Sequence, residues 1–519
     1  MKICREQSFI AHALSCAADN DRISGEEIHM ANMFSHEGRI FKFDVLVQLA
    51  RQAYEGDIDE AKIQAYCRNL VSMDTPRVRC CVYKEREILR QRVRLAMGKM
   101  ADETAEYNPR QIVQVIDAAC DGCSIKKIRV TDNCRKCMAK SCVAACRFDA
   151  MHIGINRSEI DYSKCKECGA CANACPYNAI VVTERPCFSH CPVQAIHWDE
   201  HGIAVIDEEK CINCGQCEGA CPFGAIEDIS WVVPVVQLLK MGTPAYAVVA
   251  PSIQGQFDNT SLPQIMKAIE MLGFEKCFEV AIGADAVAQT EYLELKEHKA
   301  EGKPLTTSCC PAFVNMLKIH FPKQYAENKS TTVTPMMAIA RKLKKEHPDH
   351  GIVFIGPCLA KKQEAMQEAT AVDYVLTFEE LAALLVAKGI NPPEVEVENP
   401  ELYPSNYGRN FAGSGGVAGA VAQAAKEAGD GPYTAYMADG AFECKKQLTL
   451  LRAGKFKEDI LEGMCCVGGC IAGPASISDT ITVKSRRNKE NMNTDKKTIQ
   501  QSLEIFSFDG VDMNVTHKI

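Results

Sequence analysis

Two features are missing from this 519-residue chain: a long apolar run and an excess of positive charge. No stretch of about 18 apolar residues occurs, so the sequence predicts no bilayer-spanning helix. The formal net charge of −8 gives no indication of binding to nucleic acid or to an anionic membrane. The N-terminal apolar stretch is interrupted by Glu6 and His12 and makes a poor secretory signal. We therefore expect a protein of the reducing cytoplasm.

Cysteine, in contrast, is abundant, with 29 residues. In a small secreted domain this number would indicate disulfides, but the chain is too long for such a domain and its cysteines are spaced like metal ligands. The hydrophobic fraction of 47% and the charged fraction of 24% are typical of a soluble globular protein. The length is enough for about three domains.

Composition divides the chain into four parts. Residues 1–108 have apolar residues at helical spacing and predict a helical accessory or interaction region. Residues 109–232 are dense in cysteine, and the stretches between the cysteines are too short for an ordinary core, so folding there should depend on iron. Residues 240–480 form the third part, and the polar residues 481–519 are expected to be a peripheral tail.

The third part alternates short apolar segments with helical patterns. Four segments each predict a buried strand that runs into a loop: AYAVVAPS, PLTTSCCP, GIVFIGPC and PYTAYMADG. Helical patterns such as TPMMAIARKLKKE and FEELAALLVAKG lie between them. The alternation predicts an α/β domain with parallel sheets and helices on both faces. Ligand sites in such domains lie at the carboxyl ends of strands, and three of the four loops carry candidate residues.

The cysteine-dense part contains repeated ligand motifs for [4Fe–4S] clusters. In the clearest one, three cysteines ligate one cubane and the fourth, before proline, ligates its neighbour: Cys165-x2-Cys168-x2-Cys171-x3-Cys175-Pro176. A slightly lengthened unit precedes it: Cys134-x2-Cys137-x4-Cys142-x3-Cys146. Zinc sites, the alternative, usually use two separated cysteine pairs without this third cysteine or the terminal Cys-Pro.

Exchange of the fourth cysteines between the two units gives two clusters. The first would be held by Cys134, Cys137, Cys142 and Cys175. The second would be held by Cys165, Cys168, Cys171 and Cys146. The predicted fold of this part is an α+β ferredoxin-like domain.

The same motif recurs further along the chain: Cys211-x2-Cys214-x2-Cys217-x3-Cys221-Pro222, preceded by the shortened unit Cys187-x3-Cys191-Pro192. Exchange assigns a third cluster to Cys211, Cys214, Cys217 and Cys191. This leaves Cys187 and Cys221, for which Cys120 and Cys123 are the candidate partners in a fourth cluster. Cys80 and Cys81 are also available, so the fourth set stays open. Several clusters in series imply electron transfer over a distance to a reaction site.

Three further cysteine motifs, in the third part, lack ferredoxin spacing: Thr307-Ser308-Cys309-Cys310-Pro311, Gly356-Pro357-Cys358-Leu359-Ala360-Lys361-Lys362 and Met464-Cys465-Cys466-Val467-Gly468-Gly469-Cys470. They could be unrelated buried thiols, since free cysteine is often a core residue. Their order and spacing, however, resemble the three signatures of the [FeFe]-hydrogenases, and this likeness spans most of residues 245–475. The cysteine-dense part resembles the accessory domain of the clostridial-type, group B members.

The resemblance implies a fold and a cofactor. Two doubly wound parallel-sheet lobes would enclose a cleft for an H-cluster, which is a cubane joined through one cysteine to a two-iron unit with CO, cyanide and a dithiolate bridge. The matching ligands are Cys310, Cys358, Cys466 and, as the bridge, Cys470. Cys309 matches the thiol that passes protons, and Lys361 matches the lysine that binds a cyanide. The matching lining residues are Ala250, Pro251, Ser252, Gly415, Gly416 and Met464.

A proton route is implied by the same resemblance. Glu291 and Glu294 align with the relay glutamates of the family if two residues are inserted before Cys309, and Ser330 aligns with the relay serine. The two glutamates are three apart and share one helix face, although composition alone would place both in solvent. A thiol with an ordinary pKa near about 8.5 is a workable proton donor at neutral pH. An anionic site in a dry pocket needs a fixed cation, which Lys361 can supply.

Four departures from the family pattern occur. Gly356 stands where many relatives have Met, Met336 where many have glutamine, and Cys465 adds a thiol beside Cys466. The segment TSCCPAF replaces a common TSCCPGW. These changes leave the cluster type unaltered and bear on catalytic bias and oxygen tolerance.

The expected activity is that of a ferredoxin hydrogenase, the reversible conversion of two protons and two electrons into H2. A ferredoxin-type carrier would be the electron partner, and dedicated maturation proteins would build the two-iron unit. One alternative is a non-catalytic hydrogenase-like iron–sulfur assembly protein, which the intact second motif with Lys361 disfavours. The other is an H2 sensor, disfavoured because no signalling module is recognisable, although residues 1–105 remain without an assigned role.

Overall fold

The computed structural model describes residues 37–56, 79–123, 126–367, 371–397, 403–491 and 497–515, together with a few single positions between 58 and 76. In the N-terminal region the described helices are α2 (Glu37–Glu55) and α4 (Val82–Ala96), which pack on each other. They contain the helical patterns around residues 43–54 and 85–98. The pattern FIAHALSCAA, predicted helical, lies outside the described residues.

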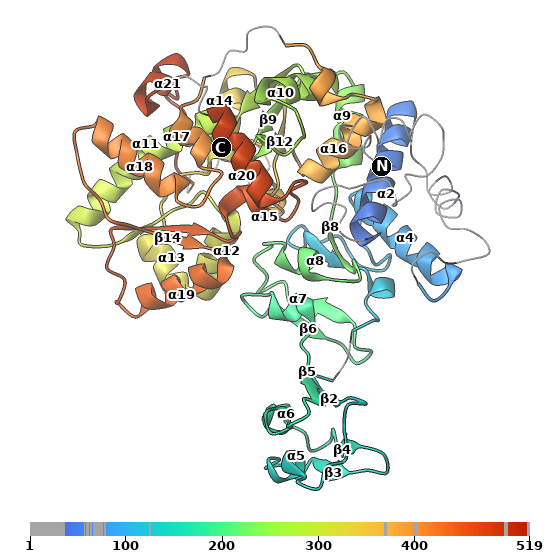
Figure 1. Ribbon diagram of the computed structural model, residues 1–519. Coiled ribbons are helices and arrows are strands. Elements are labelled where there is room, and N and C mark those ends of the chain that lie inside the picture. The colour runs from blue at the N-terminus through green and yellow to red at the C-terminus, as the bar shows by residue number, and fades with distance from the viewer. Residues whose placement is uncertain are drawn as a thin grey trace.

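The cysteine-dense part consists of very short elements. Its strands form four antiparallel pairs, which are β1 (Val113–Val115) with β8 (Ile226–Asp228), β2 (Ile128–Val130) with β5 (Ile180–Val182), β3 (Met151–Ile153) with β4 (Ser158–Ile160), and β6 (Ile196–Trp198) with β7 (Ala204–Ile206). Its short helices are η2 (Asp117–Ala119), α5 (Ser141–Ala144), α6 (Ala170–Asn173), α7 (Pro186–Ser189) and α8 (Gln216–Ala220). Figure 1 shows that β2 to β5, with α5 and α6, project from the molecule as an arm.

The third part contains two parallel sheets, as the sequence predicts. The first has four strands in the order β10 (Lys276–Glu279), β9 (Ala245–Val249), β12 (Gly351–Ile355) and β13 (Tyr374–Leu376). The second has three strands in the order β11 (Leu305–Thr306), β15 (Ile460–Met464) and β14 (Ala435–Asp439). All five residues of β9, β12 and β15 are buried, as expected for strands covered on both faces.

Helices surround both sheets. The helices of this part are α9 (Val232–Lys240), η3 (Pro251–Ile253), α10 (Leu262–Met271), α11 (Ala281–Ala300), α12 (Pro311–His320), α13 (Pro322–Asn328), α14 (Pro335–Glu346), α15 (Ala360–Gln367), α16 (Phe378–Lys388), η4 (Pro392–Glu394), α17 (Asn406–Asn410), α18 (Gly416–Glu427), α19 (Ala441–Arg452) and η5 (Gly469–Ala472). The long helix α11 contacts α14, α17 and α18. The architecture is therefore the α/β class predicted from the sequence, beside an α+β iron–sulfur part and a helical region.

The segment after residue 480 is packed more closely than its polarity predicts. It forms α20 (Thr480–Asn491) and α21 (Ile499–Ile505), and α21 contacts α11 and α18. In α20 the side chain of Val483 is fully buried, and the guanidinium of Arg487 donates to the carbonyl oxygen of Arg409 at 2.9 Å. The described part of the tail is thus part of the α/β core.

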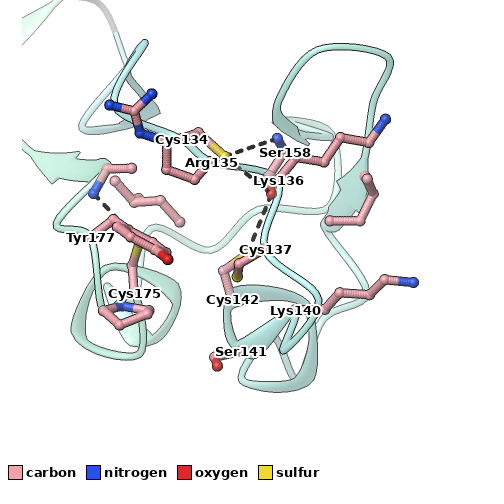
Figure 2. Close-up of a pocket in the computed structure, with 14 residues that line it drawn as sticks. Cys134, Arg135, Lys136, Cys137, Lys140, Ser141, Cys142, Ser158, Cys175 and Tyr177 are labelled. Carbon is pink, nitrogen blue, oxygen red and sulfur yellow. Dashed lines mark hydrogen bonds between the residues drawn. The ribbon is translucent and has the colours of Figure 1, made fainter.

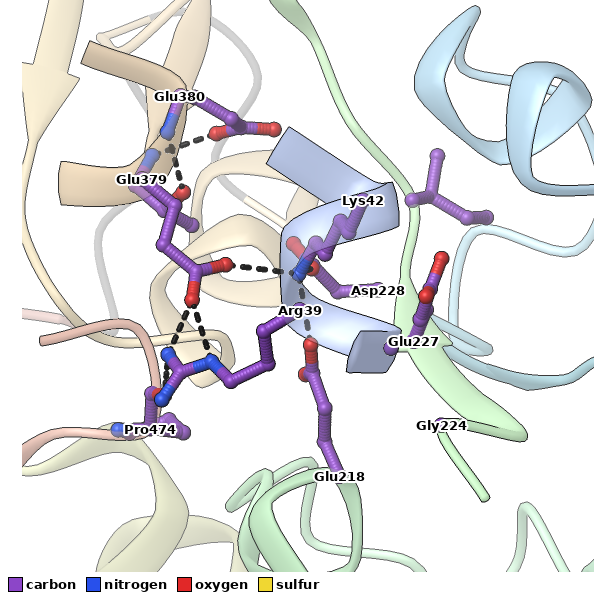
Figure 3. Close-up of polar contacts among 12 residues, drawn as sticks. Arg39, Lys42, Glu218, Gly224, Glu227, Asp228, Glu379, Glu380 and Pro474 are labelled. Carbon is purple, nitrogen blue, oxygen red and sulfur yellow. Dashed lines mark hydrogen bonds and ion pairs between the residues drawn. The ribbon is translucent and has the colours of Figure 1, made fainter. Parts of the chain in front are cut away.

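A buried network of ion pairs joins the N-terminal region to the other two parts (Figure 3). Lys42 of α2 lies 2.7 Å from Asp228 of β8, 2.6 Å from Glu218 of α8 and 3.1 Å from Glu379 of α16. Arg39, one turn earlier, donates through Nε to Glu379 at 2.9 Å. Because buried charges are costly unless paired, this network fixes the relative position of the three parts.

None of the helices in the described ranges combines the length and the apolar character that crossing a membrane requires.

Candidate active site and cluster-binding cysteines

The loops at the carboxyl ends of β9, β11, β12 and β15 converge on one cavity. The four thiols matched to the H-cluster ligands line it, namely Cys310, Cys358, Cys466 and Cys470. Six other predicted site residues also line it, namely Cys309, Lys361, Ala250, Pro251, Ser252 and Met464. Three motifs that are up to 160 residues apart in sequence thus face the same space.

Two residues that were expected in the cavity wall lie elsewhere, at the start of α18. Gly415 and Gly416 are not among the residues that line the cavity. Gly415 has a left-handed φ of 85° at the start of α18, and its N–H donates to the buried carboxylate of Glu462 at 2.7 Å. A Cβ on Gly416 would meet the carbonyl oxygen of Asn410 at 1.8 Å, so this glycine is needed for packing. The glycines that do line the cavity are Gly469 and Gly473.

The cationic group of Lys361 is held by a residue that sequence reasoning missed. Its Nζ lies 2.7 Å from Oε2 of Glu364, one helical turn further along α15. The hydroxyl of Thr334 donates to Oε1 of the same carboxylate at 2.5 Å. The spacing of three between Lys361 and Glu364 was a readable signal for this ion pair.

The hydroxyl of Ser252 has no hydrogen-bond partner anywhere in the described part of the chain, although it is fully buried. A buried polar group without a partner costs free energy, so its position in the cavity wall indicates a ligand that completes the site.

Gly356, one of the departures from the family pattern, packs closely against a residue of the cavity wall. A Cβ at this position would lie 2.6 Å from the ring of Phe354, which itself lines the cavity.

The extra thiol of Cys465 contacts a ligand position. It is buried, and its hydrogen bond to the Cys310 sulfur lowers the pKa of Cys310 to about 6. Burial alone has the opposite effect on the other ligand positions, and it raises the pKa of Cys358 and of Cys470 to about 12. Cys310 also begins α12, directly before Pro311, where the free N–H groups of the first turn favour an anion.

The residues of the predicted proton route lie close together, on α11 and on the loops that carry Ser308 and Ser330. Both the backbone N–H and the hydroxyl of Ser308 donate to Oε1 of Glu291, at 3.0 and 3.1 Å. Burial raises the pKa of Glu291 to about 7, against hydrogen bonds from Ser308 and Ser330 that lower it. Ser330 donates to Oε2 of Glu294 at 2.5 Å, and Glu294 is partly exposed. The set therefore runs from the residue next to Cys309 toward the surface.

Cys309 is protonated at neutral pH in this setting. Burial raises the pKa of its thiol well above the ordinary range, and the neighbouring Glu291 carboxylate raises it further. His298, further along α11, is partly buried, and its Nδ1 has no partner among the described residues.

Several of the arm cysteines that were assigned to the same cluster lie close to one another. Figure 2 shows the first set, in which Cys134, Cys137, Cys142 and Cys175 line one pocket. The backbone N–H of Ser158 donates to the sulfur of Cys134 at 3.4 Å. In the second set, burial raises the pKa of Cys171, and the neighbouring thiols of Cys165 and Cys146 contribute to this rise.

The third and fourth sets lie nearer the α/β part. Burial raises the pKa of Cys217 well above its ordinary range, and three neighbouring thiols add to the effect: Cys214, Cys211 and Cys191. Burial likewise raises the pKa of Cys187 to about 11, with contributions from Cys221, Cys120 and Cys123. The structure thus brings together the four cysteines that the sequence left open, and the exposed Cys80 and Cys81 are not among these neighbours.

One repeated hydrogen bond shows that the four units are equivalent. In each, the fourth cysteine sulfur accepts the N–H of the residue four positions later, at 3.2 to 3.4 Å, from Ala150 to Cys146, Ala179 to Cys175, Ala195 to Cys191 and Ala225 to Cys221. Such bonds stabilise thiolate ligands and tune cluster potentials.

The third set reaches the main cavity directly. Cys214 lines that cavity together with the H-cluster cysteines. The next residue, Gly215, has a left-handed φ of 74°, and a Cβ there would lie 2.8 Å from Leu359 and from Pro474. Only glycine allows this close approach between the iron–sulfur loop and the loop of Cys358.

Comparison with known families identifies the class of protein. A 4Fe-4S binding domain matches residues 158–181 and 204–227, so the chain is an iron–sulfur protein. The iron-only hydrogenase large subunit, C-terminal domain, matches residues 243–474. The chain is therefore an [FeFe]-hydrogenase-like protein, and all residues that line the cavity except Cys214 lie within the matched hydrogenase domain.

Curated relatives agree with this class. The chain is 29% identical over 372 residues to the periplasmic [Fe] hydrogenase large subunit of Nitratidesulfovibrio vulgaris, covering 61% of this chain and 85% of that protein. It is 27% identical over 261 residues to iron hydrogenase 1 of Clostridium pasteurianum, covering 40% of this chain and 44% of that protein. The match thus spans less than half of the clostridial relative. A variant of the [FeFe]-hydrogenase HydA1 from Chlamydomonas reinhardtii aligns with a TM-score of 0.45 and 22% identity, over 55% of this chain and 96% of that one.

Proposed function

We propose that this protein is an [FeFe]-hydrogenase that interconverts H2 with protons and electrons at an H-cluster in the cavity lined by the three motifs. The observation that carries the proposal is the convergence of three distant motifs on that cavity. Their thiols and Lys361 meet there, and Cys214 of the third cluster set faces the same space. The proposal thus joins an electron path, a metal-binding thiol set and a proton route at one place, which is what the reaction requires.

The residues of the cavity fit such a cluster. Four thiols surround the space, and Ser252 contributes a hydroxyl that has no other partner among the described residues. The ammonium of Lys361, which is paired with Glu364, lines the same space and would place positive charge beside a group with anionic ligands. Cys310, Cys358, Cys466 and Cys470 would hold the cluster. When bound, it would supply iron with an open position for H2 or a proton.

The protein's own groups would handle the proton. The Cys309 Sγ holds a proton at neutral pH because burial raises the pKa of this thiol. Glu291, with a pKa near 7, can take up and release a proton in the same pH range. The Ser330 hydroxyl lies between the carboxyl groups of Glu291 and Glu294, where it can relay the proton to the exposed side.

The cluster sets would form a linear path. The arm holds the first and second sets, and the fourth set includes Cys123 and Cys187, which flank the strands β2 and β5 that lead into the arm. The third set then reaches the cavity through Cys214. Electrons would pass from the first set through the second, fourth and third to the H-cluster, with a ferredoxin-type protein as external carrier.

The test is H2 evolution from reduced viologen by protein loaded with cubanes and a synthetic two-iron precursor. We expect the wild type to be active and the Cys309→Ala variant to lose at least about 100-fold in rate, the usual contribution of a positioned proton donor. Cys277→Ala is the matched control, because Cys277 is a buried thiol on β10 that does not line the cavity. A fully loaded wild type without activity would instead indicate an iron–sulfur assembly protein or an H2 sensor.

A further inference from the structure

The arm is basic although the chain as a whole is acidic. Residues 126–184 contain ten Lys and Arg residues and six Asp and Glu residues, whereas the whole chain has 59 and 67. Some of this positive charge offsets the anionic cubanes inside the arm. Two of the exposed basic residues near the first cluster set, Arg135 and Lys140, have no carboxylate partner in the described part of the chain. Their charge is therefore available to a partner molecule.

The lengthened cysteine spacing gives the arm a distinctive end. Cys137 and Cys142 are separated by four residues, whereas the equivalent cysteines of the second and third sets are separated by two. Lys140 adopts a left-handed φ of 48° at the start of α5, the place that Gly169 has before α6. The two additional residues leave the side chain of Met138 98% exposed, directly beside the ligand position Cys137.

A second exposed apolar side chain lies on the neighbouring β3–β4 turn. Ile155 is 87% exposed, and Lys136 Nζ donates to its carbonyl oxygen at 2.8 Å, which ties this turn to the cysteine loop. We call Arg135, Lys136, Met138, Lys140 and Ile155 the tip patch. Figure 2 shows Arg135, Lys136 and Lys140 around the Cys134 set, and Figure 1 places the β3–β4 hairpin at the end of the arm away from the body.

We propose that the tip patch is the docking surface for a small acidic one-electron carrier protein. The inference rests on the proposed function, because a path of clusters needs a donor or acceptor at its outer end. Basic side chains around an apolar centre attract an acidic partner and then exclude water from a small contact area. Transient electron-transfer complexes use small interfaces of this kind. The patch also borders the first cluster set, whose Cys142 lies in α5 at the outer end of the arm (Figure 1), so the carrier would deliver electrons at the start of the path.

The experiment measures binding and electron delivery separately. The probe is a small acidic bacterial ferredoxin, and a basic cytochrome c serves as the control of opposite charge. The test variants are Arg135→Gln with Lys140→Gln, and separately Met138→Asp. The matched control is Lys267→Gln with Lys323→Gln, which removes two exposed charges from the α/β part. All proteins are loaded with cubanes and compared by cluster content.

We expect both test variants to bind ferredoxin about tenfold or more weakly at low salt. The difference for the double variant should shrink at high ionic strength, because exposed charges are screened. The control variant should bind ferredoxin as tightly as the wild type does. The affinity for cytochrome c should not fall in the test variants. The ratio of ferredoxin-driven to viologen-driven H2 evolution should fall in parallel in the test variants.

Unchanged ferredoxin affinity in both test variants, or an equal loss in the control, would overturn the proposal. The proposal would also be overturned if the double variant kept its affinity for ferredoxin and lost only its binding to anionic lipid vesicles. Binding does not require H2 chemistry, so the two proposals fail independently. If the protein makes no H2 but its ferredoxin affinity still depends on Arg135 and Lys140, the docking proposal stands and the hydrogenase proposal fails.

Discussion

Lys362 Nζ lies 2.6 Å from Oδ2 of Asp228, and both side chains are buried. Lys362 follows the Lys361 of the second hydrogenase motif in α15, and Asp228 ends β8 of the iron–sulfur part. The same ammonium also lies 2.9 Å from Glu380 of α16. This pair therefore fixes the helix that carries the active-site lysine to the domain that supplies the electrons.

Replacement of Lys362 by Met should destabilise the junction between these two parts. It leaves the carboxylates of Asp228 and Glu380 buried with one cation fewer, and removal of one partner from a buried ion pair costs about 3–5 kcal/mol. A multidomain iron protein does not unfold in two states, so local stability is the better measure. Hydrogen exchange on the cluster-loaded protein should show protection lost first in β8, α15 and α16.

Lys446→Met provides the control, because its side chain is 65% exposed and pairs with Glu443 on the surface. Such a pair contributes about 0–1 kcal/mol, so exchange should hardly change. Adding Asp228→Asn to Lys362→Met should recover part of the lost protection, since it removes one of the stranded charges. Equal effects at positions 362 and 446 would show that the buried pair does not hold the junction.

The sequence predicted the architecture of the α/β part because its signals are local. Strands such as Ala245–Val249 and Gly351–Ile355 are continuous apolar runs, and buried parallel strands have this pattern. The regular cysteine spacing also predicted which arm thiols gather, because an exchange of fourth cysteines is a property of the repeat itself. The fourth set stayed open because Cys120 and Cys123 are outside any repeat, and only the fold shows that they meet Cys187.

The remaining features depend on contacts between distant segments. The ion network of Lys42 joins residues that are up to 337 positions apart, and no sequence pattern marks such pairs. Arg487 was assigned to a polar tail, yet it is buried and close enough to Cys470 to lower the pKa of that thiol. Gly415 and Gly416 matched lining positions by alignment, whereas their backbone forms the start of α18.

Replacement of Cys465 by Ala should make the reduction potential of the cubane at Cys310 more negative. The Cys465 thiol hydrogen-bonds the Cys310 sulfur, and such bonds withdraw negative charge from the ligand and favour the reduced cluster. A redox titration followed by EPR, on protein that holds cubanes but no two-iron unit, measures the shift. Cys444→Ala is the control, because Cys444 contacts Cys465 and its thiol lies 3.5 Å from the carbonyl oxygen of Ala438. No difference between the two variants would rule out a tuning role for the extra thiol.

Replacement of Glu291 by Gln should block the proton route and change how stability depends on pH. Burial raises the pKa of Glu291 from 4.5 to about 7, so its ionisation in the folded protein is disfavoured. The wild type should therefore lose stability, relative to the Gln variant, as pH rises from about 4.5 to about 7, by on the order of 3 kcal/mol. H2 evolution should fall by at least about 100-fold.

Glu297→Gln is the matched control for this variant, because Glu297 is exposed on the same helix α11. It should keep both the rate and the pH profile of the wild type. The relative local stabilities come from hydrogen exchange in α11 of the cluster-loaded proteins, with the variant and the wild type compared at each of several pH values. A Glu291→Gln variant whose stability keeps a constant difference from the wild type between pH 4.5 and 7 would contradict the raised pKa.

Gly215 and Gly169 form a natural matched pair for testing electron delivery to the cavity. Both follow the second cysteine of a cluster motif with a φ near 75°, so alanine adds a similar backbone strain of about 1–2 kcal/mol at each. A Cβ at Gly215 would in addition lie 2.8 Å from Leu359 and Pro474, whereas at Gly169 the nearest atom is 4.0 Å away. We therefore expect Gly215→Ala to push the third cluster loop away from the Cys358 loop. Its ferredoxin-driven H2 evolution should fall several-fold below that of Gly169→Ala, in proteins shown by EPR to hold equal numbers of cubanes. Equal losses in the two variants would assign the effect to backbone strain and remove the close contact from the electron path.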